Sequence, residues 1–194
     1  MNLEKAFAEV NRRANIINNP EFQCSFDRFK ELATECGKIK KRGIREAISA
    51  LEGEMRGYFK DTYRINYGPN IKGPDFGVTG LGPWAGVTHL ENKNPVSSEI
   101  DKAEGGDGNL SQQSRHMVKK AEWARKHWSN REKICNKFPD VTADALPNTP
   151  QQIGVLYDLY DVHNSEEKKI VINRIDQYTT DIVYTLTLNE NSNI

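Results

Sequence analysis

The spacing of apolar residues changes once along this chain, and that change limits the fold to one that joins helices to a sheet. Up to about residue 59, apolar side chains recur every three or four positions, which is the period of an amphipathic helix. Three helices are predicted, at residues 3–17, at residues 26–39 behind a Ser25 N-cap and ending near Gly37, and at residues 44–59. After Asp61 apolar and polar residues alternate, which is the period of a strand.

Turn-forming residues divide the rest of the chain. Strands are predicted at 63–67, 75–79 and 85–93, the last two joined by the turn-rich residues 80–83. A glycine-rich loop at 104–109, a helix at 110–128, a short helix at 153–160 and strands at 169–174 and 181–188 complete the pattern. We expect an α/β (α+β) fold in one globular domain, with a core at 43–194 and an N-terminal helical extension at 1–42 packed on it.

The overall composition narrows the classes of function. Lys and Arg number 27 and Asp and Glu number 27, so the net charge is zero and any basic surface for nucleic acid must be local. Three cysteines without a CxxC pair argue against a disulfide framework and a zinc knuckle, and favour a reducing, cytoplasmic setting. No stretch is apolar enough for a signal peptide or a membrane span, although delivery by a dedicated secretion machine stays open.

The residues suited to chemistry lie between Gly73 and Lys93. On a strand of period two, His89, Glu91 and Lys93 project from one face. If Asp75 begins the partner strand, its carboxylate lies beside Glu91. Two carboxylates and the backbone carbonyl of Asn92 would then form a hard-oxygen site of the kind that Mg²⁺ prefers, with Mn²⁺ as a substitute.

Phosphodiester hydrolysis needs the same set of groups. A divalent metal neutralises charge on the phosphate, and a positioned water attacks it. Lys93 supplies a cation that can hold that water or stabilise developing negative charge. The alternative to a catalytic site is a solvated hairpin face that carries a Glu91–Lys93 ion pair.

Pro74-Asp75 followed by Glu91-Asn92-Lys93 resembles the PD-(D/E)XK nuclease superfamily, in which a Pro-Asp pair on one strand precedes Glu-x-Lys on the next. The resemblance covers roughly the central two thirds of the chain. It implies a restriction-endonuclease-like core: a helix, three strands, a helix and a further strand, forming a mixed sheet flanked by helices. It also implies a Mg²⁺-dependent endonuclease acting on DNA or RNA, with DNA favoured. The helices before Gly43 have no counterpart in that core.

The same resemblance implies two further site residues. Many members carry a third metal-binding carboxylate on the helix before the first strand, and Glu52 and Glu54 are the candidates here. Glu54 is preferred because its side of the helix is lined by small residues that would let it approach the sheet. Members also place a glutamine on the helix after the third strand, and Gln113 is the match; the alternative is a buried structural amide.

Other residues near the motif keep two interpretations. His89 could act as a base, but a lone strand histidine is more often a structural hydrogen-bonding group. Trp84, at the tip of the predicted hairpin, could stack on a base or pack in the core. Arg115 and Lys120 could contact phosphate or be solvated. The remaining histidines lack metal-ligand spacing, so a zinc enzyme is not expected.

Several functions share this set of residues. A restriction-type endonuclease or a repair or resolvase enzyme would usually be a homodimer, whereas a bacterial toxin module would need an immunity protein as partner. A catalytically inactive module of the same fold that binds nucleic acid or protein is the main alternative. A helical interaction protein with an incidental hairpin is a third.

Overall fold

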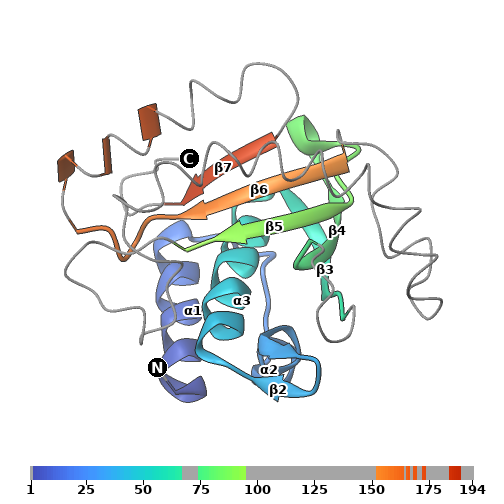
Figure 1. Cartoon of the computed structure of the whole chain (residues 1–194), viewed down its shortest axis with the longest axis vertical. Coiled ribbons are helices and arrows are strands. Elements are labelled where there is room, and N and C mark those ends of the chain that lie inside the picture. The colour runs from blue at the N-terminus through green and yellow to red at the C-terminus, as the bar shows by residue number, and fades with distance from the viewer. Residues whose placement is uncertain are drawn as a thin grey trace.

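The structure, a computed structural model, describes residues 2–66, 74–94, 152–163, 165–166, 168–169, 172–173 and 184–188. Its helices cover one face of a five-stranded sheet (Figure 1). The helices are α1 (Leu3–Ile17), α2 (Phe26–Ala33) and α3 (Lys41–Met55), with a short 3-10 helix η1 (Gly82–Trp84). The sheet strands are β3 (Phe59–Arg64), β4 (Phe76–Gly80), β5 (His89–Lys93), β6 (Ile153–Asp158) and β7 (Tyr184–Leu188). A small hairpin of β1 (Thr34–Glu35) and β2 (Lys38–Ile39) joins α2 to α3.

The sheet combines antiparallel and parallel pairing in the order β3-β4-β5-β6-β7. β4 pairs antiparallel with β3 and with β5, and β6 and β7 run parallel to β5. Parallel neighbours need long connections, and 59 residues separate Lys93 from Ile153 in the sequence. The predicted combination of helices with a mixed sheet is confirmed.

The predicted starts of α1 and α2 are confirmed, whereas α3 begins at Lys41, before the predicted Ile44, and α2 and α3 end earlier than predicted. Ser25 caps α2 by accepting a hydrogen bond at its Oγ from the Arg28 N–H (3.1 Å). The chain then leaves the helix after Ala33, because the hairpin turn places Cys36 and Gly37 at φ 48° and 74°. Gly57, at φ 74°, follows the last turn of α3, so residues after it belong to β3 instead of the helix.

Two predictions in the C-terminal part are wrong. Residues 153–160, expected as a short helix, contain β6, whose residues are buried throughout. A strand paired on both edges and covered on both faces has no polar alternation, so its sequence is easily taken for a buried helix. Within 169–174, expected as a strand, the described residues are helical, and Glu166 and Lys169 form an ion pair with helical i,i+3 spacing.

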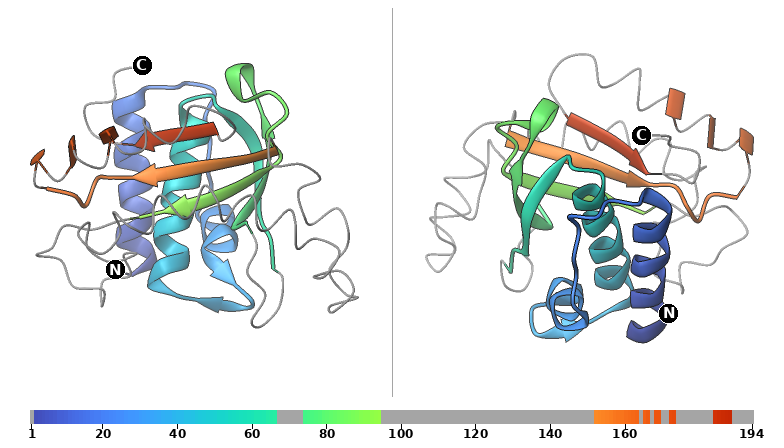
Figure 2. Two further views of the ribbon diagram at one scale, coloured as in Figure 1. Left: turned by 45° about the horizontal axis from the view of Figure 1, so that its top comes forward. Right: turned by 180° about the vertical axis from the view of Figure 1, so that it is seen from behind.

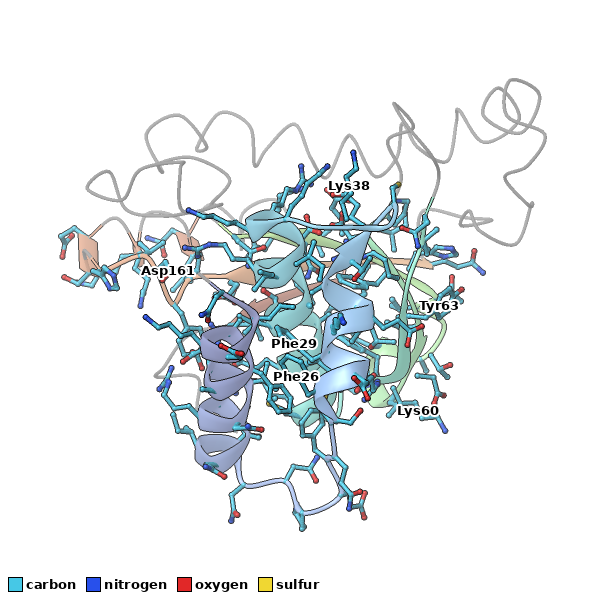
Figure 3. The ribbon with its side chains drawn as sticks, turned by 90° about the horizontal axis from the view of Figure 1, so that it is seen from below. Phe26, Phe29, Lys38, Lys60, Tyr63 and Asp161 are labelled. Carbon is cyan, nitrogen blue, oxygen red and sulfur yellow. The ribbon has the colours of Figure 1, made fainter. Side chains whose placement is uncertain are left out.

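A continuous apolar core joins the N-terminal helices to the sheet. Phe7 of α1 packs on Phe26 and Phe29 of α2, which lie between the two helices in Figure 3. Leu90, Leu156 and Leu186 extend this core from the sheet, and Figure 2 shows α1 and α3 side by side beneath it. Residues of α1 and α2 therefore belong to the same core as residues of the strands.

Trp84 belongs to this core. Its side chain is 4% exposed and packs against Tyr58 and Phe59. It also fills the space beside Gly154, where an added Cβ would lie 2.3 Å from the indole ring. The packing alternative for Trp84 is therefore the correct one. Across the described residues, no helix is both long and apolar enough to cross a bilayer.

Candidate functional site

The alternation of β5 separates its side chains into two sets. Leu90 lies in the core beneath the sheet, and Asn92 donates from Nδ2 to the backbone carbonyl of Glu46 on α3 (2.7 Å). Side chains of successive strand residues point to opposite faces, so Glu91 and Lys93 project from the face away from α3. Both are buried. The prediction that these two charges share a face agrees with the strand as observed.

Asp75 lies at the start of β4, directly beside β5. Its backbone N–H donates to the Leu90 carbonyl (2.7 Å), and its Oδ2 accepts from the Asn92 N–H (2.8 Å). The antiparallel register pairs Phe76 with Leu90, and the charge of Glu91 acts on the neighbouring Asp75 carboxylate. The structure therefore brings together the two carboxylates that the sequence motif predicts.

These carboxylates interact strongly. Burial raises the pKa of Asp75 well above its usual range, and the negative charges of Glu46 and Glu91 raise it further. The ammonium of Lys93 and the Asn92 N–H oppose that rise without cancelling it. The charged form of Asp75 is therefore unfavourable in the metal-free protein, chiefly because the carboxylate is buried, and a bound cation would favour that form.

Lys93 is paired with Glu91 inside the protein. Its Nζ donates to Oε1 of Glu91, and both side chains are buried. Tyr157 of β6 is the register neighbour of Lys93, and burial together with Glu91 raises the pKa of its phenol to about 12 despite the opposing Lys93 charge. The lysine is therefore held in a protein-lined position beside the carboxylates, and the solvated hairpin face considered above is excluded for Lys93.

The donor set suits a hard divalent cation. In an extended strand the N–H and C=O of one residue point to the same side, so the Asn92 carbonyl is directed, like its N–H, toward Asp75. Two carboxylates and one carbonyl are oxygen ligands of the kind that Mg²⁺ and Mn²⁺ accept. Within the described residues, however, no three His, Cys, Asp or Glu side chains stand together as a ligand group. A cation here would depend on Asp75, Glu91, the backbone and water.

Glu54 does not lie at this site, which corrects the prediction made for it. Its carboxylate is held by the Arg28 guanidinium (2.7 Å) and by the Thr62 N–H (2.9 Å). Glu52, the alternative, is fully buried and bonds to Arg13 and Arg56. Both lie in the last turns of α3, at the end of the helix away from Asp75.

Glu46 is the α3 carboxylate whose charge acts on Asp75, and it was not predicted from the sequence. It is the only α3 residue whose charge contributes to the pKa rise of Asp75 among the causes identified. Its two oxygens accept from Arg42 (2.6 Å) and Arg64 (2.7 Å), and its side chain is buried. The available signal was that Glu46, Ala50 and Glu54 follow each other at i,i+4 spacing on one stripe of the helix.

The remaining predicted residues divide into two groups. Gln113, Arg115 and Lys120 lie outside the described residues. His89 is buried, and its Nδ1 lies 2.7 Å from the Thr88 hydroxyl, which fits a structural hydrogen-bonding role. Cys24 and Cys36 are free thiols.

The raised pKa of Asp75 predicts a pH-dependent gain in stability for Asp75→Asn. Folding raises this pKa above its ordinary value of 3.8, so the folded state favours the protonated carboxyl. The associated stabilisation is present below about pH 4 and is lost as the pH rises through the raised pKa. In metal-free buffer the variant, which cannot ionise but can still accept from the Asn92 N–H, should unfold at higher urea concentration than the wild type at pH 7.

Urea unfolding of both proteins from pH 3 to pH 8 checks this expectation. The difference should shrink toward zero at the acid end of the range. Glu31→Gln, which changes an exposed carboxylate on α2, is the matched control and should show no such trend. A wild type at least as stable as Asp75→Asn at pH 7 would show that Asp75 is not under electrostatic strain.

A separate polar cavity of about 500 Å³ lies between α1, α3 and the end of β6. Its wall includes Arg12, Arg45 and Asp161, and Figure 3 shows Asp161 on the opposite side of the structure from Lys60 and Tyr63 of β3. Arg45 forms an ion pair with Asp161, and Arg12 forms one with Glu9.

No protein-family model matches this chain, and comparisons with curated proteins and with solved structures found no significant match.

Proposed function

We propose that this chain is a metal-dependent nuclease that hydrolyses phosphodiester bonds in DNA or RNA. The observation that carries the proposal is the grouping of Asp75, Glu91 and Lys93 on adjacent antiparallel strands. Their side chains are buried or nearly so, and their charges interact. Charged groups are costly in such a place unless they are paired or used.

The order of the elements supports the same proposal. A helix, α3, is followed by the antiparallel run β3, β4 and β5, and β6 then pairs parallel to β5. The resemblance to PD-(D/E)XK nucleases implies a helix and three strands in this order; the helix expected next, at residues 110–128, lies outside the described residues. We therefore propose a restriction-endonuclease-like core that begins at α3.

In this proposal Asp75 and Glu91 hold Mg²⁺ or Mn²⁺ together with the Asn92 carbonyl. The bound ion would supply charge neutralisation for the phosphate and a more acidic water. Lys93 moves from its ion pair with Glu91 to orient the attacking water and to stabilise negative charge that develops on the phosphate. Glu46 replaces Glu54 as the helix carboxylate, acting through its charge on Asp75.

The local charge balance is consistent with this role. Three carboxylates, Glu46, Asp75 and Glu91, face three cations, Arg42, Arg64 and Lys93. The metal-free site is therefore close to neutral. Adding a divalent cation would make it positive, which suits an anionic phosphodiester and draws the substrate in.

Cleavage of plasmid DNA and of total RNA by the purified protein tests the proposal, with Mg²⁺, with Mn²⁺ and with EDTA. We expect cleavage of at least one polymer that requires metal and stops in EDTA. Cleavage that persists in EDTA would contradict a metal-dependent mechanism. Folded protein that binds either polymer without cutting it would instead support the inactive binding module.

A further inference from the structure

Arg42 occupies a position between two carboxylates of the proposed site. Its Nε donates to Oε1 of Glu46 (2.6 Å), and its Nη2 lies 4.0 Å from Oδ1 of Asp75. The side chain is 55% exposed, whereas that of Glu46 is 3% exposed. An exposed guanidinium thus reaches from solvent toward two buried or nearly buried acids.

Arg64, the other arginine on Glu46, is held far more firmly. Its guanidinium also donates to the carbonyls of Leu32 (2.8 Å) and Gly43 (3.2 Å), and it lies 4.1 Å from the centre of the Phe76 ring. Its side chain is only 4% exposed. Of these two arginines, Arg42 is the one whose side chain is more than half exposed, so it can turn toward solvent without opening the core.

The start of α3 gives Arg42 a second partner to move toward. Lys40, Lys41 and Arg42 stand together at this end of the helix, which has no acidic residue in its first turn and no side-chain cap. The helix dipole is positive here, and the carboxylates of Glu35, 3.6 Å from the Lys40 Nζ, and Glu46 lie beside these cations. A phosphate group is the anion that helix N-termini and arginine forks both bind well.

We propose that Arg42 is a placeholder cation for the metal site: in the metal-free protein it bonds to Glu46 and lies 4.0 Å from Asp75, and it turns to a phosphate of the nucleic-acid strand when a divalent cation binds Asp75 and Glu91. This inference rests on the proposed metal-dependent function. It assigns to Arg42 two opposite effects, because the same side chain competes with the cation and contacts the substrate. Removing an arginine with a purely structural role would not strengthen cation binding while it weakens substrate binding.

Arg42→Ala is therefore expected to bind Mn²⁺ about five- to tenfold more tightly than the wild type, since a charge about 4 Å from an acid near the surface is removed. The same variant should bind a labelled DNA duplex, or RNA of the same sequence, about five- to tenfold more weakly when Ca²⁺ replaces Mg²⁺. The slope of log affinity against log salt should fall by about one.

Isothermal titration with Mn²⁺ and a fluorescence titration with the labelled strand measure the two effects on the full chain. Arg12→Ala is the matched control, because Arg12 is also an exposed helix arginine (44%) that bonds to a glutamate on its own helix, Glu9. Arg42→Lys keeps the charge and should bind Mn²⁺ as the wild type does. The control should change neither affinity.

Each outcome bears on a different claim. Tighter Mn²⁺ binding by Arg42→Ala, together with weaker nucleic-acid binding, supports the placeholder role. Mn²⁺ binding that is measurable for Arg42→Ala but not for the wild type supports it too. Equal or weaker Mn²⁺ binding by the variant, with a wild type that binds, overturns this inference while leaving the metal site in place. Absence of Mn²⁺ binding from both proteins overturns the metal site and, with it, the inference.

Discussion

Replacing Lys93 with alanine is expected to slow phosphodiester cleavage by about 10²- to 10³-fold, the usual effect of removing one group that stabilises charge in the transition state. The Lys93 ammonium bonds to Glu91, and its charge also acts on Asp75. Its loss removes the positive charge at the attacking water and leaves the two carboxylates in place. The variant should consequently still bind Mn²⁺ while its maximal rate falls.

Two further variants separate catalysis from folding in this experiment. Lys93→Met fills more of the buried space than alanine and should show the same loss of rate. Lys60→Ala removes an exposed lysine of β3 and should cleave at the wild-type rate. Circular dichroism establishes that each protein is folded before rates are compared. A folded Lys93 variant within about threefold of the wild-type rate would exclude Lys93 from the reaction.

Replacing Arg13 with alanine is expected to destabilise the protein by about 3–5 kcal/mol, the cost of removing one partner from a buried ion pair. Nη1 of Arg13 donates to Glu52 (2.7 Å) and to Asp158 (2.8 Å), and its guanidinium lies 3.7 Å from the centre of the Tyr160 ring. Burial alone would lower the pKa of Arg13, but Asp158 and Glu52 outweigh it and raise that pKa. Without Arg13, two buried carboxylates lose a shared cation.

Urea unfolding measures this loss, with Arg12→Ala as the neighbouring control. Arg12 is 44% exposed and bonds to Glu9 on its own helix, so its removal should change stability by less than about 1 kcal/mol. A loss below about 1 kcal/mol for Arg13→Ala would mean that the carboxylates find water or other partners in its absence. The link between α1, α3 and β6 would then rest on apolar packing.

The central motif could be predicted because it depends on short-range geometry. A strand of period two fixes which face Glu91 and Lys93 share, and a connection rich in glycine and proline fixes that their strand pairs with the one after Asp75. Few tertiary assumptions were needed to bring those residues together. The same reasoning predicted α1 and the start of α2 from capping residues and helical spacing.

The helix carboxylate could not be chosen correctly from the sequence. A helical wheel gives the direction of each side chain around the axis, but it does not show which part of the helix lies beside the site. Glu46 and Glu54 lie on one stripe of α3, about 12 Å apart along its axis at 1.5 Å per residue. Which end of that stripe meets Asp75 is decided by how β4 and β5 cross the helix. Glu54 instead bonds to Arg28 of α2, a residue 26 positions away in the sequence, and helical spacing does not reveal such a contact.

The assignment of 153–160 as a helix failed for a different reason. Every residue of β6 is buried, since β5 and β7 flank it and apolar clusters cover both of its faces. Its sequence therefore lacks the polar positions that reveal a period. Short length and the β-branched residues Ile153 and Val155 were the remaining clues.

The most direct test of the account is the position of Mn²⁺ in crystals of the protein, located by its anomalous scattering. We expect one peak bounded by the carboxylates of Asp75 and Glu91 and the Asn92 carbonyl, at about 2.0–2.6 Å from each oxygen that binds it directly. That result would establish the metal site on which Lys93 and Arg42 are proposed to act. A well-ordered site without a peak at saturating Mn²⁺, or a peak elsewhere in the molecule alone, would contradict it.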